Sequence, residues 1–159
     1  MHRGWLESLA APRENAMTVQ SILSTKGSEC VTTSGTASLR DAAKAMAEGR
    51  FGALVVSATG DTVDGIISER DIVRAVAEHG SSALDLPVSR AMTKDVITCQ
   101  RGDRVDAVMG IMSEKHFRHM PVVEGERLVG MVSMTDIMRK KLDDVQHEAT
   151  ALRDFIAGH

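Results

Sequence analysis

The sequence predicts an α/β (α+β) fold: two tandem β-α-β-β-α repeats related by a pseudo-twofold axis, with an extended C-terminal helix. The first observation is a duplication, because the segment Gly65–Arg74 returns in similar form as Gly130–Arg139. The second is that strand-length apolar runs and helix-spaced apolar faces follow one another in the same order in both halves. Duplicated units usually pack about a pseudo-twofold axis and leave two related clefts, which is where ligands are expected.

The chain has 159 residues, 43% of them hydrophobic, which is enough to bury one good core made of two halves. We expect four segments: a flexible N-terminal arm over 1–16, a first repeat over 17–85, a second repeat over 86–141, and a heptad-patterned helix over 142–159. The arm matches nothing in either repeat, so Met17 is a candidate for the true start.

The first repeat begins with a short helix whose apolar face holds Val19, Ile22 and Leu23 and whose cap is Thr18. The elements that should follow are a strand over 31–33, a helix over 39–48 stopped by Gly49, strands over 53–56 and 63–67 joined as a hairpin, a helix over 71–79 ended by Gly80, and a polar linker over 81–87.

The second repeat has the same order, with a shorter hairpin turn over 124–126. Pro121 lies in its second strand and suits a strand start or an edge strand, because proline has no N–H to donate. The last helix carries an apolar residue every three or four positions, at Met138, Leu142, Val145, Ala149, Leu152 and Ile156. Such a stripe predicts either packing against the chain's own domain or contact with a second copy in a homodimer.

Composition argues against several classes of protein. The net charge is −3 and the aromatic residues are one Trp and three Phe, so no basic and aromatic surface for nucleic acid is expected. No apolar run approaches the ~18 residues of a membrane span, and the N-terminus lacks the apolar region of a signal peptide. Cys30 and Cys99 are far apart and should be free thiols. These features favour a cytoplasmic protein.

The repeated Ser-x-x-Asp pattern has two interpretations. Ser68 with Asp71, and Ser133 with Asp136, lie between a strand and a helix, where each pair can form a capping box that serves stability alone. The same helix ends can bind phosphate through their N–H groups and the Ser hydroxyls, while each Asp accepts the hydroxyls of a ribose. Arg70 can add a charged phosphate contact, for which the other copy has only the hydroxyl of Thr135.

The ordered double pattern from Met17 to Lys141 resembles the tandem cystathionine-β-synthase (CBS) domain pair, or Bateman module, and the chain is similar to the small stand-alone members of that family. The resemblance implies a non-catalytic, regulatory protein that senses energy or redox state. It implies that AMP or NAD(H) is bound in the cleft between the repeats, with ATP and ADP as further candidates. A homodimer and an unknown regulated protein are the implied partners.

Site residues follow from the resemblance position by position. Asp71 and Asp136 would hold riboses, and Ser68 and Ser133 would face phosphates. The remaining implied contacts are Thr32 and Thr98 lining the clefts, Ile97 and Met120 beside an adenine ring, and Arg118 and His119, in a segment that ends at Pro121, aimed at phosphate. Lys26 belongs either to a plain turn or to a loop that reaches a phosphate.

The two copies are not equivalent. The first half has Gly52 and Ala53 where the second has Arg118 and His119, so two dissimilar sites or one long dinucleotide fit better than two identical sites. A metal at His116 and His119 lacks an evident third ligand, and no base adjoins either Ser to make it a nucleophile. The rival hypothesis is a ligand-free interaction module in which the motifs are only caps.

Overall fold

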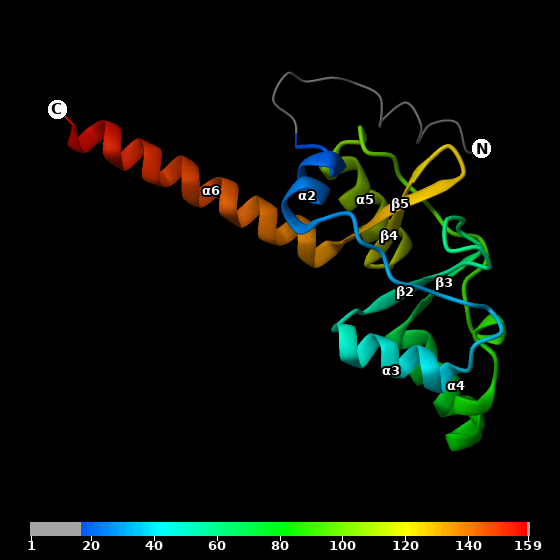
Figure 1. Cartoon of the computed structure of the whole chain (residues 1–159). Coiled ribbons are helices and arrows are strands. Elements are labelled where there is room, and N and C mark those ends of the chain that lie inside the picture. Colours follow the sequence, from blue (N-terminus) through cyan, green and yellow to red (C-terminus); the bar gives the residue numbers. More distant parts are fainter. Residues whose placement is uncertain (1–16, 159) are drawn as a thin grey trace. The chain divides into compact units, whose positions relative to one another are not determined.

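The computed structural model describes residues 17–158, and Figure 1 traces their helices and strands. The chain forms two compact units. Unit 1 contains the residues up to Gly27, Gly102–Arg118 and the residues from Val132 onward; unit 2 contains Ser28–Arg101 and His119–Met131. This division does not follow the two sequence repeats, whose predicted boundaries stay predictions.

Unit 2 contains the first sheet and the second sheet up to Met131; the end of the last strand belongs to unit 1. The first sheet has the order β1 (Thr32–Thr33), β2 (Ala53–Val56) and β3 (Gly65–Ser68), with β1 parallel and β3 antiparallel to β2. The second sheet pairs β4 (His119–Glu124) with β5 (Arg127–Ser133). All four residues of β2 are buried, as a central strand requires.

The duplication reappears in the strand register. Thr33 pairs with Val56 in the first repeat, and Cys99 pairs with Val122 in a parallel bridge in the second. The second contact is only a single bridge, and Pro121 explains why. Its carbonyl accepts from Cys99 N at 3.0 Å, and the amide nitrogen of a strand residue faces the same neighbour as its carbonyl. Pro121 has no N–H there, so the parallel ladder cannot extend toward Ile97.

Two helices pack on the core of unit 2: α3 (Leu39–Gly49) and α4 (Glu69–His79). Ser38 caps α3 by accepting from Asp41 N, and Ser68 caps α4. The two helices and the first sheet share one apolar cluster, made of Leu39, Ala42, Met46, Leu54, Val56, Ile67, Ala75, Ala83 and Val88. This cluster fixes where β3 ends and α4 begins, which is where the first Ser-x-x-Asp motif lies.

Several local expectations differ from the structure: β3 begins at Gly65 and α4 at Glu69, two residues away from the expected starts at 63 and 71. Gly49 was expected to stop its helix, but it is the last residue of α3, and Arg50 takes the left-handed cap position with φ 56°. Packing favours a glycine here, because a Cβ at Gly49 would overlap Cε2 of the Phe51 ring. The expected polar linker over 81–87 contains a 3₁₀ turn, η1 (Gly80–Asp85), that buries Ala83; a second short turn, η2 (Val88–Arg90), follows it.

Unit 1 is built from α2 (Val19–Lys26), α5 (Val105–Lys115) and α6 (Met134–Ala157), and α6 contacts both other helices. Val19, Ile22 and Leu23 are buried as expected, but the Thr18 side chain makes no cap hydrogen bond. Instead, backbone bonds hold the start of α2, with Val19 N donating to Asp103 O and Val105 N donating to Met17 O. These bonds tie α2 to the segment that begins α5.

The predicted heptad stripe lies on α6 and is exposed. Met138 is 56% exposed, Leu142 and Val145 are each 63% exposed, and Ile156 is 67% exposed. Within residues 17–158, the expectation that this stripe packs against the chain's own domain is therefore wrong. No helix within residues 17–158 is both long and apolar enough to cross a membrane.

Candidate functional site

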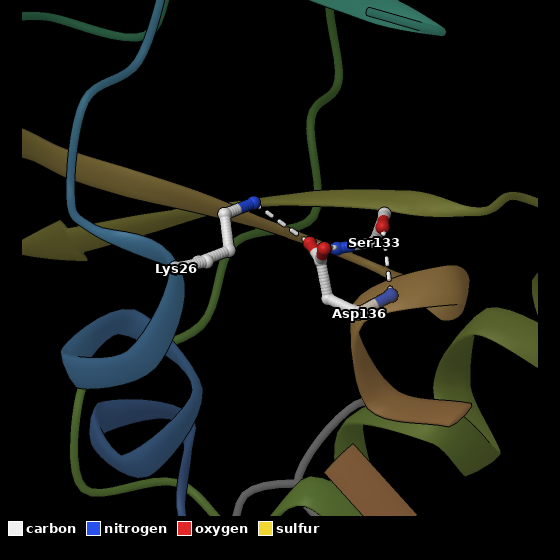
Figure 2. A network of polar contacts seen from close by, with 3 residues as sticks. All are labelled: Lys26, Ser133 and Asp136. Carbon is white, nitrogen blue, oxygen red and sulfur yellow. Dashed lines mark hydrogen bonds and ion pairs between the residues drawn. The ribbon is translucent and has the colours of Figure 1, made fainter. Parts of the chain in front are cut away.

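The second Ser-x-x-Asp motif forms a charged cluster in unit 1, shown in Figure 2. Ser133 and Asp136 make a complete capping box at the start of α6: Asp136 N donates to Ser133 Oγ at 3.1 Å, and Ser133 N donates to Asp136 Oδ2 at 2.9 Å. Lys26, the last residue of α2, joins them, with Nζ 2.7 Å from the same Oδ2. The capping interpretation is thus correct for this motif, and the motif also holds a lysine that capping does not need.

Opposing effects set the charge state of Asp136. Burial raises the pKa of this carboxyl, whereas the hydrogen bond from Lys26, the backbone hydrogen bond from Ser133 and the positive charge of Lys26 lower it. The contributions that lower the pKa are larger in sum than the effect of burial. The pKa of Asp136 therefore lies below its ordinary value, and the carboxyl is ionised at neutral pH. Among residues 17–158, the hydrogen bonds to this carboxylate end on Oδ2, which leaves Oδ1 as an acceptor for a ligand hydroxyl.

Arg118 is held next to this cluster through its backbone. The first amide of α6, Met134 N, donates to Arg118 O at 2.8 Å, and the Arg118 side chain is exposed. Thr135, also exposed, follows in the first turn. The amides of Met134 and Asp136, both in the first turn of α6, are therefore bonded within the chain. Cationic side chains rather than the helix end must then supply most of the attraction for a phosphate.

The first motif repeats this geometry in unit 2 with different chemistry. Ser68 and Asp71 form a capping box, with Ser68 N donating to Asp71 Oδ2 at 2.8 Å. Glu69 N donates to Gly52 O at 3.1 Å, which is the counterpart of the bond between Met134 and Arg118. Glycine stands where the second copy has arginine, and the cation that pairs with Asp71 among the described residues is Arg74, at 3.7 Å between NH1 and Oδ1.

His119 lies against Gly52 in unit 2. A Cβ built on Gly52 would be 3.0 Å from both Cε1 and Nε2 of the imidazole, so the ring occupies the space that a side chain there would take. The His119 ring of the second repeat therefore lies beside the backbone that supports the first motif. The lack of a side chain at Gly52, which looked like a missing charge in the sequence, is what makes room for this ring.

The other predicted site residues lie in unit 2 and differ in accessibility. Ile97, 38% exposed, and Thr98 lie in the exposed segment before Cys99. Thr32 is half-buried in β1, Arg70 is exposed on α4, and Met120 and Pro121 are buried in β4. The buried side chain of Met120 is part of the packing of β4, and its contact with an adenine ring stays a prediction.

The ion pair of Lys26 with Asp136 is the main feature that sequence reasoning missed, since it joins residues 110 positions apart. The only sequence signal was a lysine in a turn. Within the described part of the chain, no group of three His, Cys, Asp or Glu side chains is arranged to hold a metal ion.

Comparison with known proteins identifies related chains. The sequence pattern of the family described as "CBS domain" matches residues 19–78 and again residues 88–143. The chain is 40% identical over 106 residues to an uncharacterized 17.7 kDa protein of Acidianus ambivalens, covering 66% of this chain and 63% of that protein. It is 34% identical over 122 residues to the mitochondrial CBS domain-containing protein CBSX3 of Arabidopsis thaliana, covering 74% and 59%. The match thus spans about six-tenths of the length of these relatives.

Solved structures agree with this assignment. A CBS-domain containing protein of Agrobacterium tumefaciens has a TM-score of 0.77 and 39% identity, covering 82% of this chain and 98% of that chain. The CBS domain pair of protein MJ0100, in complex with 5′-methylthioadenosine and S-adenosyl-L-methionine, has a TM-score of 0.73 and 27% identity, covering 82% and 98%.

Proposed function

Because the chain belongs to the CBS domain family, as a tandem pair of a non-catalytic and regulatory kind, we propose that it senses a phosphate-bearing adenosine derivative, AMP or NAD(H). The single observation that carries the proposal is the cluster of Lys26, Arg118, Ser133 and Asp136 at the start of α6. ATP and ADP carry the same chemical groups and are the next candidates.

The ribose is assigned to Asp136. A ribose offers two neighbouring hydroxyls, and an ionised carboxylate accepts both of them through its two oxygens. Oδ2 is occupied by the Lys26 ammonium at 2.7 Å. A ribose bound to both oxygens therefore competes with Lys26 for Oδ2 and releases this ammonium toward the phosphate of the same ligand.

The released lysine distinguishes ligand classes. Lys26 places a positive charge at the motif, and the exposed side chain of Arg118 extends from backbone that is bonded to the first amide of α6. Cations at this helix end favour a ligand with a negative phosphate and oppose the sulfonium cation of S-adenosyl-L-methionine. Protein MJ0100 is complexed with S-adenosyl-L-methionine and with 5′-methylthioadenosine, neither of which carries a phosphate. For this chain we therefore propose the opposite preference, with AMP bound more tightly than 5′-methylthioadenosine.

The test is titration calorimetry of protein confirmed to be free of carried-over nucleotide, with AMP, ADP, ATP, NAD⁺, NADH, 5′-methylthioadenosine and S-adenosyl-L-methionine. Asp136→Asn should weaken every adenosine ligand that binds. Lys26→Met should weaken AMP by about tenfold, because it removes one charge-assisted contact, while leaving 5′-methylthioadenosine unchanged or tighter.

The matched control is Asp106→Asn. Asp106 is also paired with a lysine in unit 1, with Oδ1 2.6 Å from Lys141 Nζ, but it lies on α5 and its partner lies beyond the first turn of α6. It should leave binding intact. Absence of binding by all seven ligands would contradict the proposal and favour the interaction module in which the motifs only cap helices. An equal loss in Asp106→Asn and Asp136→Asn would also count against it.

A homodimer, an unidentified regulated protein and a cytoplasmic location complete the proposed function. The CBSX3 relative is named as mitochondrial, so the compartment needs a measurement of its own, such as fractionation of the source cells.

A further inference from the structure

The exposed stripe of α6 has the regularity of a coiled coil. Taking Leu142, Ala149 and Ile156 as the a positions of a heptad makes Val145 and Leu152 the d positions. The large members of this set are 61% to 67% exposed. A row of apolar side chains at this spacing, left in water, is unusual for a surface helix.

Among residues 17–158, the apolar side chains of this row stay largely exposed. Nearer the start of α6, Lys141 pairs with Asp106 on α5. Every residue from 145 to 158 is exposed, and Figure 1 shows this half of α6 continuing beyond α2 and α5. A helical segment of this length is only marginally stable alone in water, so its helicity calls for a partner.

We propose that the partner is α6 of a second copy of this chain, in a parallel two-stranded coiled coil. This inference is independent of the ligand proposed above. In a two-fold dimer each helix presents the same surface to the other, so the evenly spaced apolar residues of one stripe can pack against those of its copy. The charges that flank the stripe then decide the direction of the two helices.

In a parallel coil, a residue at g faces the residue five positions later, at e, on the other helix. Glu148 is at g and Arg153 is at e, so each Glu148 faces the Arg153 of the other copy, and the coil gains two attractive pairs. In the preceding pair, Lys141 faces the uncharged Gln146, so this contact is neither an attraction nor a repulsion between charges. The parallel arrangement therefore contains no like-charge pair at these positions.

The antiparallel alternative brings like charges together. The register that buries the whole stripe sets Leu142 opposite Leu152, and it places g beside g and e beside e. Glu148 then faces Glu148 of the other copy, and Arg139 faces Arg153. Both contacts are repulsive, so the charge pattern favours the parallel coil.

The first experiment measures the mass of the full chain by sedimentation equilibrium. A dimer is expected, and Leu152→Asp should raise its dissociation constant at least about tenfold, because it puts a charge in the seam. Thr150→Asp, which adds the same charge at an exposed b position, is the matched control and should leave the constant unchanged. A monomeric wild-type chain, or equal effects of the two variants, would overturn the proposal.

The second experiment determines direction. Glu148→Arg should weaken a parallel dimer by about tenfold, and adding Arg153→Glu should restore it. In an antiparallel coil the single change replaces one like-charge contact with another and has little effect. In a Cys30→Ser background, Leu152→Cys should cross-link to itself on oxidation only if the helices are parallel. Cross-linking only between Leu142→Cys and Leu152→Cys chains would overturn the parallel arrangement.

Discussion

Lys26 Nζ lies 2.7 Å from Asp136 Oδ2, so an ammonium at the end of α2 neutralises the carboxylate that caps α6. The pair is partly shielded, with side-chain exposures of 34% and 14%. It connects the first helix of the described chain to the last one, and it places a cation beside a carboxylate that the sequence assigned to a ribose.

The ion pair predicts a stability change in acid. The pKa of Asp136 is lowered in the folded state, so its stabilising contribution is complete above the ordinary value of 3.8 and is lost as pH falls through the lower folded value. The hydrogen bond from Lys141 lowers the pKa of Asp106 in the same direction. Urea unfolding from about pH 5 to about pH 2 should therefore show a stability loss that Lys26→Met and Lys141→Met each reduce.

At neutral pH, Lys26→Met should cost about 0.5–1 kcal/mol, since the pair is partly exposed. A combined Lys26→Met and Lys141→Met variant should show the sum of the two acid effects. Unchanged acid sensitivity in Lys26→Met would show that the pair contributes nothing to folding.

Gly65 is predicted to be intolerant of a side chain. A Cβ at this position would lie 2.7 Å from Sδ of Met92 and 3.0 Å from Thr93 O, and the second atom is backbone and cannot easily move. Gly65→Ala should destabilise the protein by about 1–3 kcal/mol in denaturant unfolding. Gly110 in α5 is the matched control, because its Cβ would meet nothing within 4 Å. Gly110→Ala should stabilise by about 0.5–1 kcal/mol, and the same sign for both variants would contradict the steric argument.

Arg50 and His116 should each be improved by glycine. They end α3 and α5 in the left-handed conformation, with φ values of 56° and 60°. Arg50→Gly and His116→Gly remove that strain and should raise stability by up to about 1 kcal/mol, measured by thermal or urea unfolding. Glu48→Gly, inside α3, should lower it by about 1 kcal/mol. Destabilisation by all three variants would show that the side chains of Arg50 and His116 make contacts worth more than the strain.

Gly52 and His119 should show energetic coupling. Gly52→Ala places a Cβ 3.0 Å from the imidazole, so it should destabilise the protein by about 1 kcal/mol. His119→Ala should abolish that cost when the two changes are combined, giving a coupling of similar size in a double-mutant cycle. Simple additivity of the two changes would mean that the ring moves away without cost.

Much of the local structure was predictable from the sequence. The spacing of Val19, Ile22 and Leu23 predicted the buried face of α2, and the apolar run Ala53–Val56 predicted β2 with its observed bounds. The Ser and Asp residues three positions apart predicted both capping boxes. These features depend on periodicity and on contacts between near neighbours, which sequence spacing records directly.

The order of amino acids was enough to predict the duplicated order of elements, both Ser-x-x-Asp caps and the heptad stripe of α6. It could not predict that Lys26 meets Asp136, that the His119 ring fills the space over Gly52, or that the stripe is exposed among residues 17–158. The difference lies in the sequence separation of the residues that interact. Helix and strand patterns are set by residues a few positions apart, whereas an ion pair across 110 positions depends on how distant segments pack, which no local pattern encodes.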